Sequence, residues 1–356
     1  MTVYRLDIKP LAPLHRGIHG HAAKSGAVVH SDTLHAALAA SAAAAGAGPD
    51  ELQRFRTLRV SSLFPSLWNA PLYPKPFLPL SRNAEGRTED NDPKAAKRWK
   101  QVRLVSKKVL NAWLQGKGED VKGAVVRDGT AVFEQEFPEH DWPRHGLVNT
   151  QRQTGVVVDR DTAAATPYDR SLVWINTDEG AGLYCFVEAE EKEGPWLAEA
   201  FERLGYAGLG GNRTSGFGAF KLEKCAPLEI QGQTRITSFA CVSPCDFKMF
   251  MTLSLYLPTR EEVNAGVLDA PAAYDCTLRG GWIHGVAGTD RARHALRLCL
   301  EGSVFNKVGD RHGEVRDVAP EDHPHPVWRS GLAFECRMQN SECRIQNSEC
   351  RMKSEE

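Results

Sequence analysis

The 356-residue sequence lacks the long apolar run that a membrane-spanning helix needs. No stretch of about 18 or more strongly apolar residues occurs in it. Residues 1–7 alternate apolar and polar side chains and do not build the apolar centre of a signal peptide. We therefore expect a cytoplasmic protein with no membrane partner.

An excess of one charge is also missing. The chain carries 44 Lys and Arg against 45 Asp and Glu, for a formal net charge of -1. No bulk field therefore attracts nucleic acid or repels it, and any site for a polyanion must be local. Hydrophobic residues make up 42% of the chain, enough to bury a core in each of two domains, which excludes a disordered protein.

Paired cysteine motifs are scarce. The nine cysteines are an odd number, and three of them lie in a repeated tail, which argues against a disulfide framework. Cys241 and Cys245 form the one close pair outside the tail, and a zinc site would need two more ligands at similar spacing. We expect reduced thiols, no metal site and no cofactor.

Short strands and short helices are predicted to alternate in the first half of the chain. Residues 3–9 alternate apolar and polar side chains, which predicts a half-buried strand. Ser31 and Asp32 precede an alanine-rich run, where they can cap the free amides of a helix that Gly46 ends. Residues 93–117 hold eight Lys or Arg and no acid, with apolar residues at helical spacing. They predict a basic amphipathic helix, either a solvated face over packed side chains or a phosphate contact.

The same alternation continues in the second half. Residues 195–204 predict a short helix that begins at a proline and stops at Gly205. Residues 252–257 predict a strand, and residues 259–264 and 291–299 predict helices. Both halves thus show strand, helix, strand, helix and strand, so the predicted class is α+β with two ferredoxin-like domains.

The chain ends in three near-identical seven-residue units over residues 335–355. Each unit carries two apolar residues only two positions apart, too few for the apolar seam of a coiled coil. We expect residues 335–356 to form a disordered tail without function.

The most informative stretch is residues 205–220, with six glycines in sixteen positions. Such a loop leaves its amides accessible and permits positive dihedrals, so several N–H groups can converge on a phosphate. Residues 213–215 add donor side chains. Phe217 and Gly218 stand where a nucleotide P-loop needs Lys and Ser or Thr, and Arg213 occupies the third glycine position of a dinucleotide fingerprint. The loop is predicted to bind phosphates, but not those of ATP or NAD; a tight loop between helix and strand is the structural alternative.

Residues 208–220, Gly-Leu-Gly-Gly-Asn-Arg-Thr-Ser-Gly-Phe-Gly-Ala-Phe, resemble the glycine-rich signature loop of the RAMP superfamily of CRISPR RNA-binding proteins. Three further segments resemble the subunit of type III-A (Csm-type) effector complexes that caps the 5′ handle of the CRISPR RNA. They are residues 14–17 with 31–34, residues 64–65 with 74–76, and residues 301–305 with 324–334. The order of all four segments extends the resemblance over residues 3–334. The tail is foreign to that family, and residues 34–38 carry His and Ala where it usually has Phe and a small residue.

The resemblance implies two ferredoxin-like, RRM-related domains, at residues 1–230 and 231–334, with a β-hairpin thumb at about 140–182 inserted in the first. It implies that the glycine-rich loop and the segment after the first strand hold the 5′ handle, while the thumb wedges into the guide–target duplex. Other surfaces would meet the large polymerase-like signalling subunit and the backbone RAMP subunits. The expected RNA-binding residues are His15, Arg16, His19, His21, Ser31, Gly208, Gly210, Gly211, Asn212, Arg213, Thr214, Ser215, Gly216, Phe217 and Gly218. The expected thumb residues are Thr150, Arg152, Asp159 and Arg160.

Flat side chains are also needed, because bases of single-stranded RNA stack on them. The candidates are Phe217, Tyr168 and Trp174. Overall charge near zero is compatible with such a site, since a few local phosphate contacts are enough.

Catalysis is a weaker interpretation. His15, His19, His21 and His30 could act as general acid and base, and Asp32 could ligate a metal. Neutral loop histidines and a helix cap at Ser31 or Asp32 explain these residues more simply, so we expect no catalytic residue.

Two other classes stay open. One is a metal-independent CRISPR repeat endoribonuclease that uses His19 or His21. The other is a structural interaction protein whose glycine-rich loop binds protein carboxylates.

Overall fold

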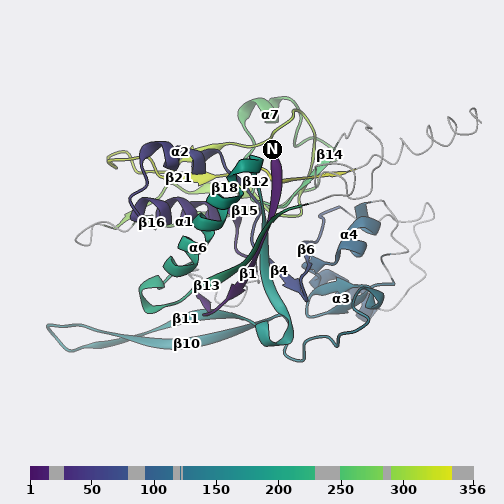
Figure 1. Cartoon of the computed structure of the whole chain (residues 1–356), viewed down its shortest axis with the longest axis horizontal. Helices are drawn as coiled ribbons and strands as arrows, with labels where there is room; N and C mark the ends of the chain where they lie inside the picture. Colours follow the sequence, from purple (N-terminus) through teal and green to yellow (C-terminus); the bar gives the residue numbers. More distant parts are fainter. Residues whose placement is uncertain are drawn as a thin grey trace, which may run out of the picture. The chain divides into compact units, whose positions relative to one another are not determined.

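The computed structural model describes residues 1–15, 28–78, 93–114, 121, 123–228, 249–283 and 290–338 (Figure 1). The chain divides into two compact units. Unit 1 comprises Met1–Leu58, Leu63–Pro71 and Asp141–Pro227, and unit 2 comprises Arg59–Ser62, Leu72–His140 and Leu228–Glu356. Both contain strands and helices, so the fold is mixed α/β. Residues 72–140, predicted as part of the first domain, group with unit 2.

Unit 1 is built on an antiparallel sheet with the strand order β13–β1–β12–β4–β5. These strands are β1 (Thr2–Pro10), β4 (Phe64–Leu67), β5 (Ala70–Pro71), β12 (Ala181–Ala189) and β13 (Phe220–Pro227). The predicted strand at residues 3–9 is confirmed. Its side chains alternate as the sequence indicates, with Tyr4, Leu6 and Ile8 buried.

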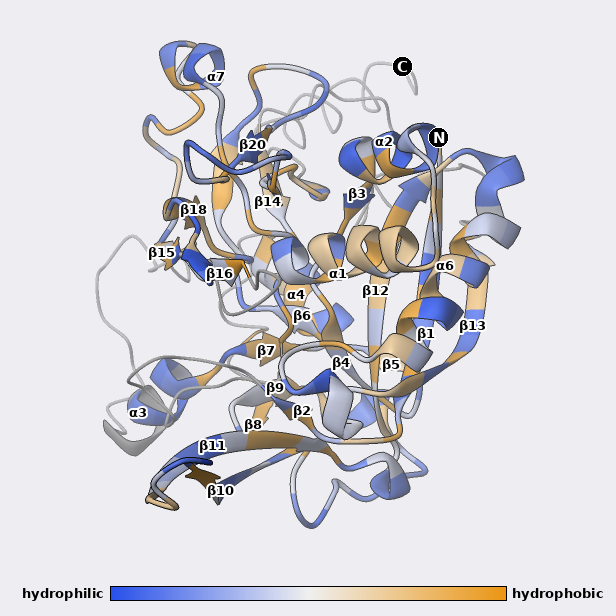
Figure 2. Ribbon diagram, turned by 90° about the vertical axis from the view of Figure 1, so that its left-hand side faces the viewer, coloured by the Kyte–Doolittle hydropathy of each residue, from blue (hydrophilic) through white to orange (hydrophobic). Residues whose placement is uncertain are grey.

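Three α-helices lie in the described part of unit 1, and α1 and α6 lie on the same face of its sheet (Figure 2). They are α1 (Ser31–Ala44), α2 (Pro49–Thr57) and α6 (Gly194–Ala207). The helix predicted over residues 195–204 is present, but it does not stop at Gly205; it continues to Ala207, and Gly208 is its C-cap. The predicted cap of α1 is wrong, because His30 occupies the N-cap position without a side-chain cap bond. Ser31 and Asp32 are instead buried in the first helical turn, where the charge of an aspartate is favourable.

A second sheet of unit 1 has the order β10–β11–β2. Its strands are β10 (Val148–Val158), β11 (Ala165–Ile175) and β2 (Leu14–His15). β10 and β11 form one long antiparallel hairpin, inside the range predicted for a hairpin. Short 3-10 turns follow at η3 (Thr177–Glu179), η4 (Glu191–Glu193) and η5 (Arg213–Ser215).

Unit 2 contains a small sheet with the order β6–β7–β9–β8. Its elements are β6 (Tyr73–Pro74), α3 (Pro93–Gln101), β7 (Leu104–Val105), α4 (Lys107–Leu114), β8 (Val125–Arg127), β9 (Thr130–Val132) and η2 (Glu134–Glu136). The single helix predicted over residues 93–117 is thus wrong. It is interrupted because Leu104 and Val105 pair in parallel with Thr130 and Ala131 of β9.

The rest of unit 2 is a set of short strands around the sheet β19–β14–β22. Its elements are β3 (Arg59–Val60), β14 (Met249–Thr252), α7 (Arg260–Asn264), β15 (Cys276–Arg279), β16 (Trp282–Ile283), β17 (Arg291–Ala292), β18 (Leu296–Cys299), β19 (Val304–Asn306), β20 (Val315–Asp317), β21 (Trp328–Ser330) and β22 (Glu335–Met338). The strand predicted at 252–257 is wrong in its bounds, because β14 covers Met249–Thr252 and so contains only the first predicted residue. The helix α7 is confirmed, with Thr259 as its N-cap.

Two predictions in this region are wrong. Residues 291–299 form β17 and β18 instead of a helix, because β18 pairs with β15. The disordered tail does not begin at residue 335, since Glu335–Met338 form β22 and pair with β14. Cys336 is buried there. The remainder of the predicted tail, residues 339–356, lies outside the described residues.

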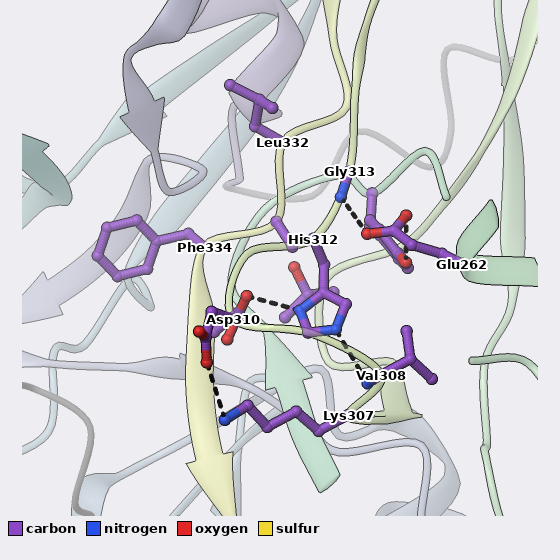
Figure 3. A network of polar contacts seen from close by, with 12 residues as sticks. Glu262, Lys307, Val308, Asp310, His312, Gly313, Leu332 and Phe334 are labelled. Atoms are coloured by element: carbon purple, nitrogen blue, oxygen red, sulfur yellow. Dashed lines mark hydrogen bonds and ion pairs between the residues drawn. The ribbon is translucent and has the colours of Figure 1, made fainter. Parts of the chain in front are cut away.

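The core of unit 2 contains a buried imidazole (Figure 3). The ring of His312 is stacked on Phe250 at 4.4 Å between centroids. Its Nδ1 lies 2.8 Å from Glu335 Oε1, and its Nε2 accepts a 3.2 Å hydrogen bond from the backbone N–H of Val308. Nε2 is therefore unprotonated, so Nδ1 carries the proton and donates to the carboxylate.

Candidate nucleic-acid interface

The glycine-rich loop begins where α6 ends. Gly208, at φ 79°, follows the helix and donates its N–H to the carbonyl of Leu204 at 2.8 Å. The N–H of Leu209 donates to the carbonyl of Gly218 at 2.9 Å, and the N–H of Gly218 donates to the carbonyl of Pro13 at 2.9 Å. The two ends of the loop are thus closed on each other and attached to the segment that precedes β2.

Close backbone approaches explain several of the glycines. The N–H of Gly211 donates to the carbonyl of His15 at 3.0 Å. A Cβ at Gly210 would lie 2.7 Å from that carbonyl oxygen, and one at Gly218 would lie 1.9 Å from the carbonyl oxygen of Leu209. Tight packing therefore accounts for these positions. Gly216 differs, because a Cβ there would meet nothing within 4 Å.

The tip of the loop, residues 212–216, is exposed. Asn212 and Gly216 flank η5 in the left-handed region, at φ 55° and 81°. The Cγ of Arg213 lies 3.5 Å from a Cβ placed at Gly208, so the arginine stem passes over the base of the loop. No carboxylate among the described residues pairs with Arg213. The loop therefore presents an exposed cation that its own unit does not neutralise.

Two contacts join the loop region to the hairpin. His15 pairs with Leu172 of β11, and its ring Nδ1 lies 3.2 Å from the carbonyl oxygen of Ser171. The guanidinium of Arg170 lies 5.0 Å from the ring centroid of Phe217, a cation–π contact. The predicted residues His15, Gly208 and 210–218 thus lie together. Arg170 was not predicted, because only the strand register places it beside the loop.

Other predicted residues lie elsewhere or outside the described chain. Arg16, His19 and His21 fall outside the described residues. Ser31 is buried in α1. Thr150 lies on β10.

The charged thumb candidates make contacts within the hairpin. Arg152 pairs with Asp169, and this contact holds the pKa of Asp169 below its usual range. Asp159 accepts hydrogen bonds from the backbone N–H groups of Asp161 at 3.0 Å and Thr162 at 2.7 Å, so it shapes the turn. Arg160 is exposed in the same turn.

A cleft of about 590 Å³ lies at the base of the hairpin. It is lined by Pro10, Leu11, Ala12, His145, Asn149, Gln151, Trp174, Ile175, Asn176, Thr177, Asp178 and Glu179. Trp174 is 42% exposed, as is Tyr168 further along β11, so two of the three predicted stacking side chains are accessible. Asn149 and Gln151 had no sequence signal, because the β10–β11 register is what places them with Trp174.

Nothing in the described part of the chain resembles a metal site, since no three His, Cys, Asp or Glu side chains are grouped to hold an ion. Cys241 and Cys245 lie outside that part. None of the described helices is long and apolar enough to cross a membrane.

Sequence comparison identifies related proteins over most of the chain. The family described as the RAMP superfamily matches residues 48–221, and the CRISPR Csm4 C-terminal domain matches residues 246–338. A CRISPR system Cms protein Csm4 of Mycobacterium tuberculosis is 28% identical over 311 residues, 84% of this chain and 86% of the relative. A Csm4 of Streptococcus thermophilus is 31% identical over 180 residues, 50% of this chain and 56% of the relative.

Solved structures show the same fold. A crystal structure of a Csm3–Csm4 subcomplex of the type III-A CRISPR–Cas interference complex matches with a TM-score of 0.63 and 17% identity, covering 96% of this chain and all (100%) of that chain. A Csm1–Csm4 cassette in complex with cA4 matches with a TM-score of 0.56 and 17% identity, covering 95% of this chain and 98% of that chain.

The glycine-rich loop, the strand order of unit 1 and the two family matches define a protein of the RAMP superfamily. Within the superfamily, the C-terminal domain match and the relatives both point to Csm4. The chain is a Csm4-like RAMP subunit.

Proposed function

We propose that the chain is a non-catalytic RNA-binding subunit that anchors the repeat-derived 5′ handle of a CRISPR RNA through residues 208–218. The observation that carries this proposal is the exposed loop tip, where Arg213 has no partner among the described residues of its unit. The backbone contacts of Gly211 and Gly218 fix the loop before any ligand arrives. A preformed loop binds an anion without the entropic cost of ordering itself.

The loop bears donors that suit a phosphodiester. The Arg213 guanidinium, the Thr214 and Ser215 hydroxyls and the Asn212 amide are all exposed at one turn. Hydrogen bonds in which an arginine meets a phosphate are stronger than neutral ones. The half-buried Phe217 and the exposed Tyr168 and Trp174 offer flat surfaces for bases.

The finer architecture is part of the proposal. The order β1, α1, β4, β12, α6, β13 in unit 1, with the sheet order β13–β1–β12–β4, supports a ferredoxin-like, RRM-related domain. The hairpin β10–β11 projects from this domain in the manner expected of a thumb that contacts the guide–target duplex (Figure 1). A second ferredoxin-like domain in unit 2 stays a prediction.

The partner subunits are proposed from those of related Csm4 chains. Related Csm4 chains occur in solved structures with Csm3 and with Csm1. We infer that this chain likewise docks onto a large signalling subunit and a backbone RAMP subunit, with target RNA reached only through the guide.

The test is Arg213→Ala in the assembled complex, read as affinity for a labelled 5′-handle RNA. We expect a loss of about 1–3 kcal/mol and an unchanged melting temperature, because charge-assisted phosphate contacts lie in that range and the side chain is exposed. Lys192→Ala is the control, since Lys192 is an exposed cation already paired with Glu190 at 2.9 Å. Equal affinity of the parent and Arg213→Ala would refute the proposal.

The endoribonuclease alternative has its own test. The isolated chain is incubated with labelled repeat RNA in the presence of a chelator. We expect intact RNA. Site-specific cleavage that disappears in His19→Ala or His21→Ala would replace the binding function with a catalytic one.

A further inference from the structure

The basic segment around α3 and β7 is not used by the glycine-rich loop, which belongs to the other unit. Residues 93–117 contain eight Lys or Arg and no acid. The structure exposes six of these cations, at Lys97, Arg98, Lys100, Arg103, Lys107 and Lys108, and Lys107 has a partner. Within the described part of the chain, no carboxylate pairs with the side chain of any of the other five. This concentration of charge of one sign stands out in a chain whose net charge is -1.

Two cations are held opposite each other at the edge of this sheet. β6 and β7 pair Pro74 with Leu104, and the backbone N–H of Lys75 donates to the carbonyl of Arg103 at 2.9 Å. Burial, and then the charge of Arg103, lower the pKa of Lys75. Like charges on directly opposed positions of neighbouring strands destabilise a sheet. The pair is therefore unfavourable unless an anion lies beside it.

Aromatic packing restricts the movement of Lys75. Its Nζ lies 5.9 Å from the ring centroid of Trp113, and the only hydrogen bond that Nζ makes within the described residues is a long 3.4 Å contact to the carbonyl of Trp99. The rings of Trp99 and Trp113 meet edge to face at 6.0 Å. Trp113 is fixed in turn by a hydrogen bond of 3.1 Å from its Nε1 to the carbonyl of Leu78. The ammonium group is thus positioned but poorly satisfied.

Nearby carboxylates are engaged elsewhere. Glu136 accepts from the Ser106 hydroxyl and from the backbone N–H groups of Phe133 and Lys108. Glu134 pairs with Arg127 at 3.4 Å. Neither Glu134 nor Glu136 therefore pairs with the exposed cations of α3.

We propose that Lys75, Arg103 and the exposed cations of α3 form a second binding surface for the phosphate backbone of single-stranded RNA, in unit 2. The proposal rests on the proposed function only in taking RNA as the ligand. Several separate point charges along a helix and a strand fit a row of phosphates, whereas a single enclosed anion would need a pocket. Lysine binds phosphate as a point charge without demanding one geometry, which suits contact with a backbone of any sequence.

The first experiment neutralises α3 in the full chain. The triple variant Lys97→Gln, Arg98→Gln, Lys100→Gln is titrated with a fluorescent single-stranded oligouridylate at several salt concentrations. Each lost phosphate contact changes the slope of log K against log[salt] by roughly 0.7, so the slope becomes less negative by about 2. Arg127→Gln is the matched control, because Arg127 lies on the same sheet but is paired with Glu134. We expect the control to keep the parental slope.

The second experiment examines the opposed pair with Arg103→Gln. Removing one of two like charges should raise the melting temperature of the free protein at low salt, while affinity for the oligouridylate falls at least about threefold. A variant that becomes more stable and binds less tightly identifies a cation retained for its ligand. A variant with parental affinity overturns the assignment of Arg103.

Combining the triple variant with Arg213→Ala separates the two proposals. If both sites bind RNA, the changes in slope add. A parental slope in the triple variant together with a reduced slope in Arg213→Ala overturns the second surface and leaves the proposed function intact. A reduced slope in the triple variant together with a parental slope in Arg213→Ala refutes RNA binding by the loop instead. If the triple variant binds RNA normally but no longer assembles with its sister subunits, the surface is a protein contact and the proposal fails.

Discussion

The backbone N–H of Gly211 donates a 3.0 Å hydrogen bond to the carbonyl oxygen of His15. The two residues are far apart in the sequence, and this bond attaches the glycine-rich loop to β2. His15 also pairs with Leu172 of β11. The loop and the hairpin are therefore joined through a two-residue strand, and the position of the loop depends on how closely its backbone can approach that strand.

A methyl group at Gly210 should displace the loop. Gly210→Ala places a Cβ 2.7 Å from the carbonyl oxygen of His15, at a φ of 101°. We expect weaker binding of the 5′-handle RNA even though Arg213 is retained, measured by fluorescence anisotropy.

Gly216→Ala is the control for that substitution. It also carries a positive φ, of 81°, but its Cβ meets nothing within 4 Å. Backbone strain alone costs it about 1–2 kcal/mol. A loss of RNA affinity in Gly210→Ala no larger than in Gly216→Ala would show that the approach to His15 is unimportant.

His35 should make the protein sensitive to acid. Burial lowers the pKa of His35 from 6.5 to about 4, while the backbone at Phe55 and Arg56 opposes this effect. Between pH 6.5 and pH 4, His35 binds a proton in the unfolded chain but not in the folded chain. Stability therefore falls as the pH drops from 6.5 towards 4, by up to about 3 kcal/mol.

The measurement compares the parent with His35→Leu, which cannot titrate at this position. Melting temperatures are recorded at pH 7.5 and pH 5. We expect the stability of the variant relative to the parent to rise at the lower pH. If the melting temperatures of the parent and the variant change by the same amount between pH 7.5 and pH 5, His35 is not a neutral, buried group.

Local pattern predicted the elements that carry a clear signal of their own, in their alternation or at their ends. The alternation of β1, the proline at the start of α6 and Thr259 before α7 each match the observed element. The glycine-rich loop was found because six glycines around an arginine are uncommon in an ordinary connection. Its rigid base could not be foreseen, since His15 approaches Gly210 only after folding.

The strands that were predicted as helices pair with strands distant in the sequence. Leu104 and Val105 lie within a helical spacing of apolar residues, but parallel pairing with β9 makes them a strand. Leu296 and Leu298 fit a strand as well as a helix, and pairing with β15 decides between them. Arg170 could not be predicted as a site residue, because it reaches Phe217 only once the hairpin has formed.

The buried His312–Glu335 pair should contribute strongly to the stability of unit 2. His312→Phe keeps an aromatic ring on Phe250 but leaves Glu335 and the N–H of Val308 without their partner. We expect a loss of roughly 3 kcal/mol in the free energy of unfolding, measured by urea denaturation. Glu335→Gln retains an acceptor oxygen for Nδ1–H and should cost less. Equal losses in both variants would assign the effect to the charge and not to the hydrogen bonds.

Truncation distinguishes the strand β22 from the repeats that follow it. A chain ending at residue 338 keeps the pairing of Glu335–Met338 with β14, whereas a chain ending at residue 334 loses it together with the buried Cys336. We expect the longer truncation product to melt like the full chain and the shorter one to melt several degrees lower by circular dichroism. Identical melting of the two products would show that β22 does not stabilise unit 2.

Photocrosslinking in the assembled complex shows whether residues 208–218 contact the 5′ handle. A guide RNA with 4-thiouridine in its 5′ handle is irradiated, and the crosslinked peptides are identified by mass spectrometry. We expect adducts within residues 208–218, with their yield reduced in Arg213→Ala. Handle adducts that map elsewhere and are unchanged by that substitution would contradict it.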